Sequence, residues 1–271
     1  MKKLLVSLSL FGFFWGVGSG LLQAQETVVT LACENKTDFP NLVGEGDKLD
    51  ANTPGMSIEA LRLVEAAMKA KKKNIKFNFI RMPWKRCMEE MKAGSVDGIF
   101  NASFKEERKE LGAYPMNGTT VDESRRITTT NYSFYVQKGK KIPWDGKTLG
   151  KLDGSVGAPA GYSIIDDLKK LGATTEEGME GTKKDFEKLG AGRLVAAAAL
   201  DKTGDHILKS DTALGAKIEK VEPAIVNKPY YVMLSHQFVA KNKELAEEIW
   251  TELGRIRDSE ELKAKWALYA K

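Results

Sequence analysis

The chain has 271 residues, and its 42 Lys and Arg residues exceed its 37 Asp and Glu residues by only five. This small basic excess gives no indication of nucleic-acid binding. The sequence has two histidines and two cysteines, and it contains none of the patterns HExxH, GxSxG, CxxC, GxxxxGK[ST] or GxGxxG. We therefore expect no catalytic residues, no metal site and no cofactor, and a protein that is not an enzyme.

Residues 1–24 have the pattern of a secretory signal peptide. Lys2 and Lys3 precede the apolar run Leu4–Leu22, and Ala24 supplies a small residue for cleavage. The run is long enough for an uncleaved membrane anchor, but its glycines and its polar exit favour cleavage. Cleavage would leave 247 of the 271 residues and, because the segment carries two lysines, would lower the net charge from +5 to +3. This length is ample for two lobes of an exported protein.

The first half of the remaining chain alternates between strand-like and helix-like segments. Residues 28–33 form a β-branched run, and residues 57–70 have apolar positions at helical spacing. Residues 75–80 alternate like a strand, residues 86–93 are helical up to Gly94, and residues 96–100 read as a buried strand. Such alternation predicts a mostly parallel sheet with helices on its faces.

A second series of similar segments follows. Residues 154–158 and 194–200 are strand-like, and helical patterns occur at 164–171 and 185–189. The segment MKAGSVDGIF (residues 91–100) is echoed by LGAGRLVAAA (residues 189–198). In both, a helix end is followed by Ala-Gly and a buried strand, which is consistent with two similar α/β lobes.

Two aromatic, strand-like stretches are candidates for connections between the lobes. They are TTTNYSFYVQ at residues 128–137 and KPYYVMLS at residues 228–235. If the chain crosses at both, residues 26–131 and 234–271 form lobe 1 and residues 132–233 form lobe 2. The tail from residue 242 is helical and ends in a capped last helix.

Cys33 and Cys87 are the two cysteines of the chain. Both are predicted near the C-terminal ends of early strands, and exported proteins form disulfides. We expect a disulfide between them, with two buried free thiols as the alternative.

Polar residues at strand ends are the candidates for a binding site, because open α/β sheets bind ligands there. Asn101 and Ser103 follow the strand at 96–100, and Arg108 lies five residues beyond Ser103. A guanidinium can hold a carboxylate through two parallel hydrogen bonds, with short polar side chains beside it. The alternative is that Arg108 belongs to a solvated charge run, KEERKE.

Further candidates follow other predicted strands. Glu34, Phe39 and Trp84 are such residues in the first series, although both aromatic residues are equally compatible with a core position. In the second series, Gly161, Tyr162 and Ser163 open a helix and would offer N–H groups to an anion. Asp201 closes the strand at 194–200, where it would either face the cleft or cap the next helix.

The sequence resembles the periplasmic solute-binding proteins of the polar amino-acid type (family 3), the substrate-binding components of ABC transporters. The strongest match is PWKRCMEEMKAGSVDGIFNASFKEERKELGAYP at residues 83–115. It is similar to that family's helix, G-x-[VI]-D strand, Ser-rich strand end and T-x-x-R step. The segment GKTLGKLDGSVGAPAGYS resembles the start of the family's second lobe, and KPYYVMLS resembles its return crossover.

The resemblance implies two Rossmann-like lobes joined by two hinge strands, the type II periplasmic binding protein fold. It also implies roles for ten ligand-binding residues. Arg108 takes an α-carboxylate with help from Ser103 and the backbone near Asn101, and Gly161, Tyr162 and Ser163 meet it from lobe 2. Phe39 and Trp84 wall the side-chain pocket, and Glu34 and Asp201 are the candidates for the ammonium group.

This sequence departs from the family pattern at three places. Val195 stands where the family has an acid, Asp201 is displaced by about one residue, and Tyr162-Ser163 replaces a threonine pair. A ligand without an α-ammonium group, or one with a bulkier body, is compatible with these departures.

The resemblance implies a monomeric periplasmic protein that captures a small carboxylate-bearing solute, with an amino acid as the first expectation, by hinge closure. It would deliver this solute to an ABC permease in the inner membrane. The alternatives are a periplasmic dehydratase-like enzyme on the same fold and the ligand-receiving subunit of a sensor.

Overall fold

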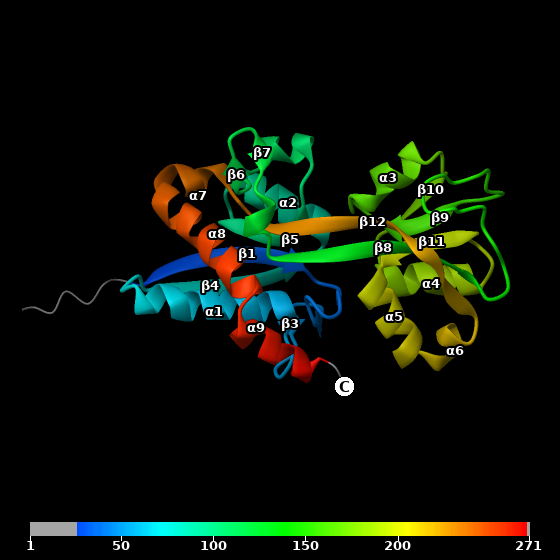
Figure 1. The fold of residues 1–271 in the computed structure, drawn as a ribbon, viewed down its shortest axis with the longest axis horizontal. Helices are drawn as coiled ribbons and strands as arrows, with labels where there is room; N and C mark the ends of the chain where they lie inside the picture. The colour runs from blue at the N-terminus through cyan, green and yellow to red at the C-terminus, as the bar shows by residue number, and fades with distance from the viewer. Residues whose placement is uncertain (1–25, 270–271) are drawn as a thin grey trace, which may run out of the picture.

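The computed structural model describes residues 26–269. These residues form an α/β protein with two lobes placed side by side along one continuous eight-stranded sheet (Figure 1). The strand order is β10-β9-β11-β8-β12-β5-β1-β4. The predicted signal segment, residues 1–24, lies outside the described residues.

Lobe 1 is built on parallel strands with helices on both faces. Strands β1 (Thr27–Glu34), β4 (Ile75–Met82) and β5 (Gly98–Ser103) are parallel, with β1 in the centre. Helices α1 (Met56–Ala70) and α2 (Trp84–Ala93) pack on opposite faces of them, as expected for right-handed crossovers in a parallel sheet. The strand ends that carry the predicted polar residues therefore meet at one edge of the lobe.

Lobe 2 repeats this arrangement on a smaller scale. Its parallel strands are β9 (Val156–Pro159), β10 (Thr175–Gly178) and β11 (Ala196–Leu200). All five residues of β11 are buried, which explains its unbroken apolar sequence. The helices of this lobe are α3 (Ile164–Lys170), α4 (Thr182–Gly190), α5 (Asp201–Ser210) and α6 (Thr212–Gly215).

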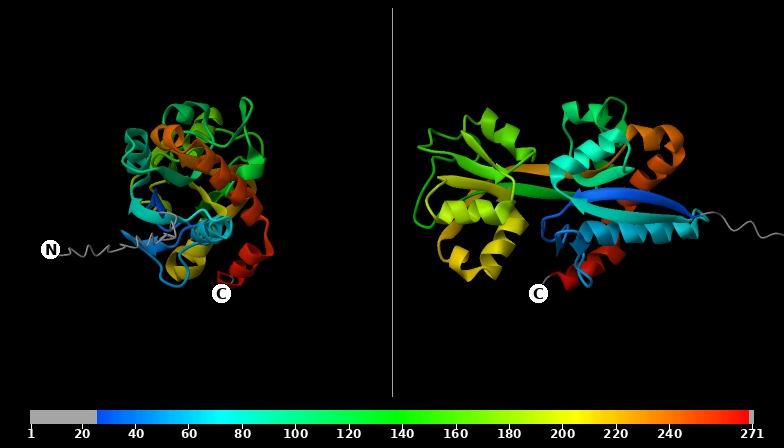
Figure 2. Two further views of the ribbon diagram at one scale, coloured as in Figure 1. Left: turned by 90° about the vertical axis from the view of Figure 1, so that its left-hand side faces the viewer. Right: turned by 180° about the vertical axis from the view of Figure 1, so that it is seen from behind.

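Two long antiparallel strands run from one lobe into the other (Figure 2). They are β8 (Thr128–Gln137) and β12 (Ile218–Leu234), which pair with each other on both sides of an irregularity between Val221 and Val226. In lobe 2, β8 also pairs with β11, whereas Tyr230–Leu234 of β12 pairs with β5 of lobe 1. We therefore propose that β12 enters lobe 1 already at Tyr230, before the predicted boundary at residues 233 and 234.

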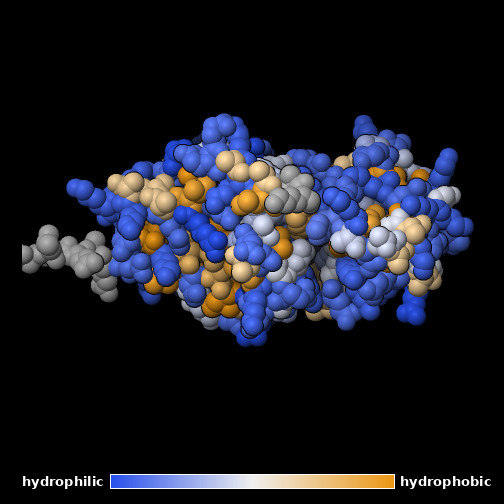
Figure 3. Space-filling view, turned by 90° about the horizontal axis from the view of Figure 1, so that it is seen from below, coloured by the Kyte–Doolittle hydropathy of each residue, from blue (hydrophilic) through white to orange (hydrophobic). Residues whose placement is uncertain are grey.

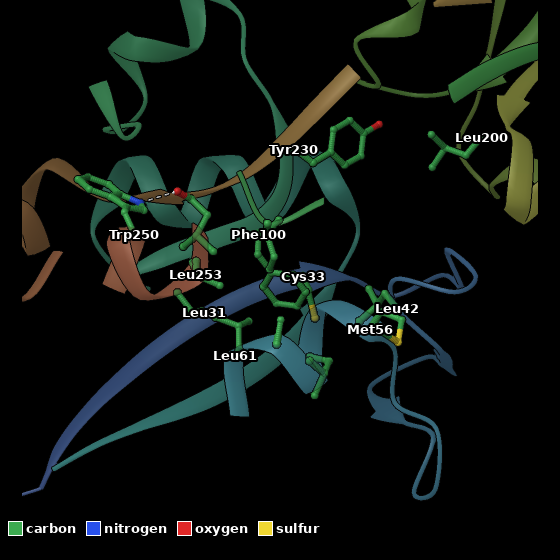
Figure 4. Close-up of a cluster of buried hydrophobic side chains, with 14 of the residues drawn as sticks. Leu31, Cys33, Leu42, Met56, Leu61, Phe100, Leu200, Tyr230, Trp250 and Leu253 are labelled. Carbon is green, nitrogen blue, oxygen red and sulfur yellow. Dashed lines mark hydrogen bonds between the residues drawn. The ribbon is translucent and has the colours of Figure 1, made fainter. Parts of the chain in front are cut away.

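The C-terminal tail packs on lobe 1. It contains α7 (His236–Lys241), α8 (Lys243–Arg257) and α9 (Glu260–Lys265). Trp250 of α8 is 2% exposed, and its indole N–H donates to the carbonyl of Val232 at 2.8 Å (Figure 4). The tail therefore completes the core of lobe 1.

Short elements fill the connections. Strands β2 (Gly44–Glu45) and β3 (Lys48–Leu49) form one small hairpin, and β6 (Met116–Asn117) and β7 (Thr120–Val121) form another. The face in Figure 3 is mainly hydrophilic, with scattered apolar patches. In the described range 26–269, no helix combines the length and the apolar character that a membrane span requires.

The expected disulfide is wrong, because Cys33 and Cys87 are free, buried thiols. Successive side chains of a strand point to opposite faces of the sheet. Cys33 lies in the cluster with Leu31 and Leu61 on the α1 face (Figure 4), whereas Cys87 of α2 lies in the cluster with Ala32 on the other face. The sheet thus separates the two sulfur atoms.

Candidate ligand-binding site

A small cavity lies between the lobes, where the strand ends of both meet. Its volume is about 30 Å³. Both lobes and both connecting strands contribute to its lining, which consists of Glu34, Asp38, Leu42, Trp84, Phe100, Asn101, Ser103, Arg108, Tyr132, Tyr162, Ser163, Leu200 and Tyr230. Seven of the ten predicted ligand-binding residues are in this set.

Arg108 points into the protein and not into solvent. It lies in the 3₁₀ helix Glu106–Glu110 and is 6% exposed, whereas Glu106 and Glu107 of the same helix are exposed. Its Nη1 donates to the carbonyl of Ser103 at 2.9 Å and to the Ser103 hydroxyl at 3.1 Å. Among the described residues that line the cavity, Arg108 is the one with a cationic side chain. The arginine is therefore separate in space from the charge run that contains it in the sequence.

Direct hydrogen bonds join the lobes at this arginine. Arg108 Nη2 donates to the carbonyl of Gly161 at 3.2 Å, and the hydroxyls of Ser103 and Ser163 are 2.8 Å apart. Gly161 thus contributes a carbonyl acceptor, not the N–H donor expected from the sequence. The rings of Trp84 and Tyr162 meet edge to face across the lobes, with centroids 6.5 Å apart.

Asn101 has a left-handed backbone conformation, with φ of 60°. Asparagine tolerates this region better than most residues, and such conformations are common at functional sites. The Oδ1 atom of Asn101 accepts a hydrogen bond of 2.7 Å from the hydroxyl of Ser57 in α1. This contact fixes the side chain at the cavity wall.

Two acids, the half-buried Glu34 and the buried Asp38, lie on the lobe 1 side of the cavity. Burial raises the pKa of Glu34 to about 6, although its carboxylate accepts from the backbone N–H groups of Asn35 and Trp84. Burial also raises the pKa of Asp38 to about 6, against the opposing effect of a 2.7 Å hydrogen bond from Thr203. Asp38 was not among the sequence-based candidates, although its neighbour Phe39 in the same loop was.

The connecting strands contribute two tyrosines that were not among the sequence-based candidates. Tyr132 of β8 and Tyr230 of β12 are buried, and their hydroxyl oxygens are 2.7 Å apart. Burial raises the pKa of both hydroxyls above the ordinary value, so both are protonated at neutral pH. The sequence feature that could have identified these two tyrosines is the aromatic character of the two crossover stretches.

Phe39 and Asp201 do not line the cavity. The ring of Phe39 stacks on His206 of α5, with centroids 4.1 Å apart, and so contacts lobe 2 outside the cavity. Asp201 is the first residue of α5, and no side-chain hydrogen bond caps this helix. Its neighbour Leu200 lines the cavity instead, so the cavity wall is apolar at this point.

Comparisons with solved structures show the same fold. A putative L-cystine ABC transporter from Listeria monocytogenes is 19% identical and has a TM-score of 0.66, covering 90% of this chain and 95% of that chain. The ancestral amino acid-binding protein AncCDT-1, a precursor of cyclohexadienyl dehydratase, is 15% identical with a TM-score of 0.65 and the same coverages. A histidine kinase sensor domain is also 15% identical with a TM-score of 0.65, covering 90% of this chain and 96% of that chain. At these identities the likeness shows the fold alone, and it confirms the type II periplasmic binding protein fold.

The sequence comparisons identify the family. No curated protein sequence matches the chain significantly. Residues 45–269, which are most of the chain, match the sequence model of one family, described as bacterial extracellular solute-binding proteins, family 3. This chain therefore belongs to the family 3 bacterial extracellular solute-binding proteins.

Proposed function

We propose that the protein binds a small carboxylate-bearing solute, an amino acid in first place, between its lobes and delivers it to an ABC transporter. The buried guanidinium of Arg108 at the cavity is the observation that supports this proposal most directly. A buried cation is costly unless it is paired, and Arg108 has carbonyl and hydroxyl partners but no carboxylate partner among the described residues. An anionic ligand would supply the missing charge through bidentate hydrogen bonds.

Hinge motion is part of the proposal because the cavity is small. Direct hydrogen bonds between the lobes close over this cavity of about 30 Å³, so we expect the lobes to separate before a ligand enters. Separation breaks the Ser103–Ser163 and Arg108–Gly161 hydrogen bonds, and only the two connecting strands and their neighbours need to bend. A ligand that contacts both lobes then favours the closed state.

Glu34 and Asp38 would face a cationic group of the ligand. Both are on the lobe 1 side of the cavity, and Asp38 takes over the role that was expected for Asp201. An ammonium group beside them would favour their charged forms and lower the raised pKa of each. Trp84, Phe100 and Leu200 would enclose the apolar part of such a ligand.

Titration calorimetry with the twenty standard L-amino acids tests the proposal. We expect at least one to bind to the wild-type protein and Arg108→Ala to weaken its binding by roughly 10²-fold or more, as is typical when a partner of a buried charge is removed. Arg108→Lys keeps the charge but loses the planar fork, so it should restore only part of the affinity. Arg86→Ala is the matched control, because Arg86 is an exposed arginine paired with Glu90 on α2. Unchanged affinity in Arg108→Ala would contradict the proposed site.

An enzymatic role is the second candidate, supported by the two raised carboxyl pKa values. A carboxyl group with a pKa of about 6 is suited to general acid or base chemistry near neutral pH, and Glu34 and Asp38 are both of this kind. The solved structures of this fold include a precursor of a dehydratase. Turnover of cyclic carboxylates by the purified protein, lost in Glu34→Gln or Asp38→Asn, would favour this candidate over the binding role.

The delivery partner is the second part of the proposal. The family is extracellular, and similar folds occur both in ABC importer components and in a sensor domain. We propose a monomer in the periplasm that docks on an ABC permease. Uptake of radiolabelled ligand that depends on this protein would support transport, whereas ligand-dependent signalling without uptake would favour the sensor role.

A further inference from the structure

A chain of hydrogen bonds crosses from lobe 1 to lobe 2 beside the cavity. Arg108 Nη1 donates to the hydroxyl of Ser103 at 3.1 Å. The hydroxyl oxygens of Ser103 and Ser163 are 2.8 Å apart, and Lys228 Nζ donates to the hydroxyl of Ser163 at 3.1 Å. The chain therefore has a cationic donor at each end and two hydroxyl groups in the middle.

The count of hydrogens in this chain has a chemical consequence. Each serine hydroxyl has one hydrogen, and the two hydroxyls need only one hydrogen to bond to each other. Neither end of the chain can take the other hydrogen, because guanidinium and ammonium groups donate and do not accept. The serine pair therefore keeps one hydrogen for an acceptor in the cavity, which both serines line.

Lys228 is held in place for this contact. It lies on β12 opposite Thr130 of β8, in the part of the strand that joins the lobes. Its side chain is 15% exposed, forms an ion pair with Asp167 of α3, and lies 3.4 Å from the carbonyl oxygen of Ser163. Lys228 is not among the residues that line the cavity, so its influence on a ligand would pass through Ser163.

We propose that Lys228 is a positioning residue that makes the site selective for a carboxylate over a carboxamide. This inference rests on the proposed function. With Lys228 donating to Ser163, the serine pair keeps its free hydrogen for the cavity beside the guanidinium of Arg108, and a carboxylate accepts from both of these donors. The NH₂ group of a carboxamide would instead face donors, which leaves polar groups without partners.

The probes are the twenty standard L-amino acids and the corresponding L-amino-acid amides. Lys228→Met removes the ammonium but keeps most of the side-chain volume. We expect it to weaken binding of the acid about tenfold, the usual loss for one hydrogen bond to a charged group, and to leave binding of the amide nearly unchanged. Lys220→Met is the matched control. Lys220 lies on the same strand and forms an ion pair of 2.6 Å with Asp205, and neither residue lines the cavity.

A double-mutant cycle separates positioning from a general structural role. If Lys228 acts through Ser163, then Lys228→Met should have little further effect in a Ser163→Ala background. A role through Asp167 alone would give the same loss in both backgrounds. Lys228→Arg keeps a donor at this position and should recover part of the affinity for the acid.

The outcomes distinguish this inference from the proposed function. Loss of binding in Arg108→Ala together with unchanged acid-to-amide selectivity in Lys228→Met overturns the inference alone. Additive effects in the cycle also overturn it. Unchanged binding in Arg108→Ala overturns the proposed function, and binding of none of the probes to the wild-type protein overturns both.

Discussion

Asp185 is a buried acid without a hydrogen-bond partner in the described range 26–269, and its replacement by asparagine should stabilise the protein above neutral pH. Asp185 lies on α4 and is 2% exposed, and neither carboxyl oxygen has a hydrogen-bond partner among the described residues. The carboxyl group of Asp185 packs against Gly178 of β10. The contact is so close that a β-carbon at position 178 would lie only 2.2 Å from Oδ1 of Asp185. Burial therefore raises its pKa from the ordinary 3.8 to about 7.

The size of the effect follows from this pKa. A carboxyl group that binds protons more tightly in the folded state stabilises that state most at low pH, and stability falls as the pH rises from about 4 to about 7. Each tenfold change in proton affinity corresponds to about 1.4 kcal/mol, so the full difference is about 4 kcal/mol. An asparagine side chain cannot ionise, so Asp185→Asn should be about 4 kcal/mol more stable than wild type at pH 8 and less than about 1 kcal/mol more stable at pH 4.

Urea unfolding of both proteins at a series of pH values measures this difference directly. Ionisation of all other groups cancels in the comparison, so the difference between the two curves should rise between pH 4 and pH 7 and then become flat. Asp153→Asn is the control, because Asp153 is an exposed acid in the same lobe and its replacement should give no such rise. A difference for Asp185→Asn that stays constant with pH would refute the reasoning.

Two further predictions concern packing and thiols. Trp250→Ala should cost about 3–5 kcal/mol of unfolding free energy, because a fully buried indole and its hydrogen bond are lost, whereas Trp266→Ala, at a site that is 38% exposed, should cost less than about 1 kcal/mol in the same urea assay. Cys33 and Cys87 should both resist a thiol reagent in the native protein, because both are buried and burial raises the pKa of Cys33 to about 12 and that of Cys87 further. Both should react after unfolding without a reductant, and fewer than two thiols in that state would show that a disulfide exists.

Strand-end reasoning anticipated which lobe 1 residues lie together at the cavity, for a physical reason. Parallel strands bring their C-terminal ends to one edge, so residues that end or follow β1 and β5 must lie close together whatever the rest of the chain does. Glu34, Ser103 and Arg108 are placed in this way. The same reasoning placed Tyr162 and Ser163 after β9 in lobe 2.

Contacts that depend on the register of strand pairing could not be predicted from the sequence. Tyr230 and Tyr231 are adjacent and point to opposite faces of β12, and Tyr230 lines the cavity while Tyr231 packs in the core with Cys87. Pairing with β5 and β8 decides which of the two faces the cavity, and β12 has irregular register against both. Cys33 illustrates the same limit. The alternation of side chains along β1 was evident from the sequence, but the sequence did not show that α2, which carries Cys87, covers the opposite face of the sheet.

The contacts between the lobes constrain how a ligand can drive closure. The hydrogen bonds Ser103–Ser163, Arg108–Gly161 and Asp38–Thr203 join protein atoms only, so they favour the closed state by themselves. A ligand shifts the equilibrium only through interactions that are better in the closed than in the open state. Because a carbonyl of lobe 2 already occupies one donor of Arg108, a carboxylate must replace a neutral acceptor with a charged one to gain free energy. The charge of the ligand, more than its hydrogen-bonding capacity, is therefore the property through which this site would couple binding to closure.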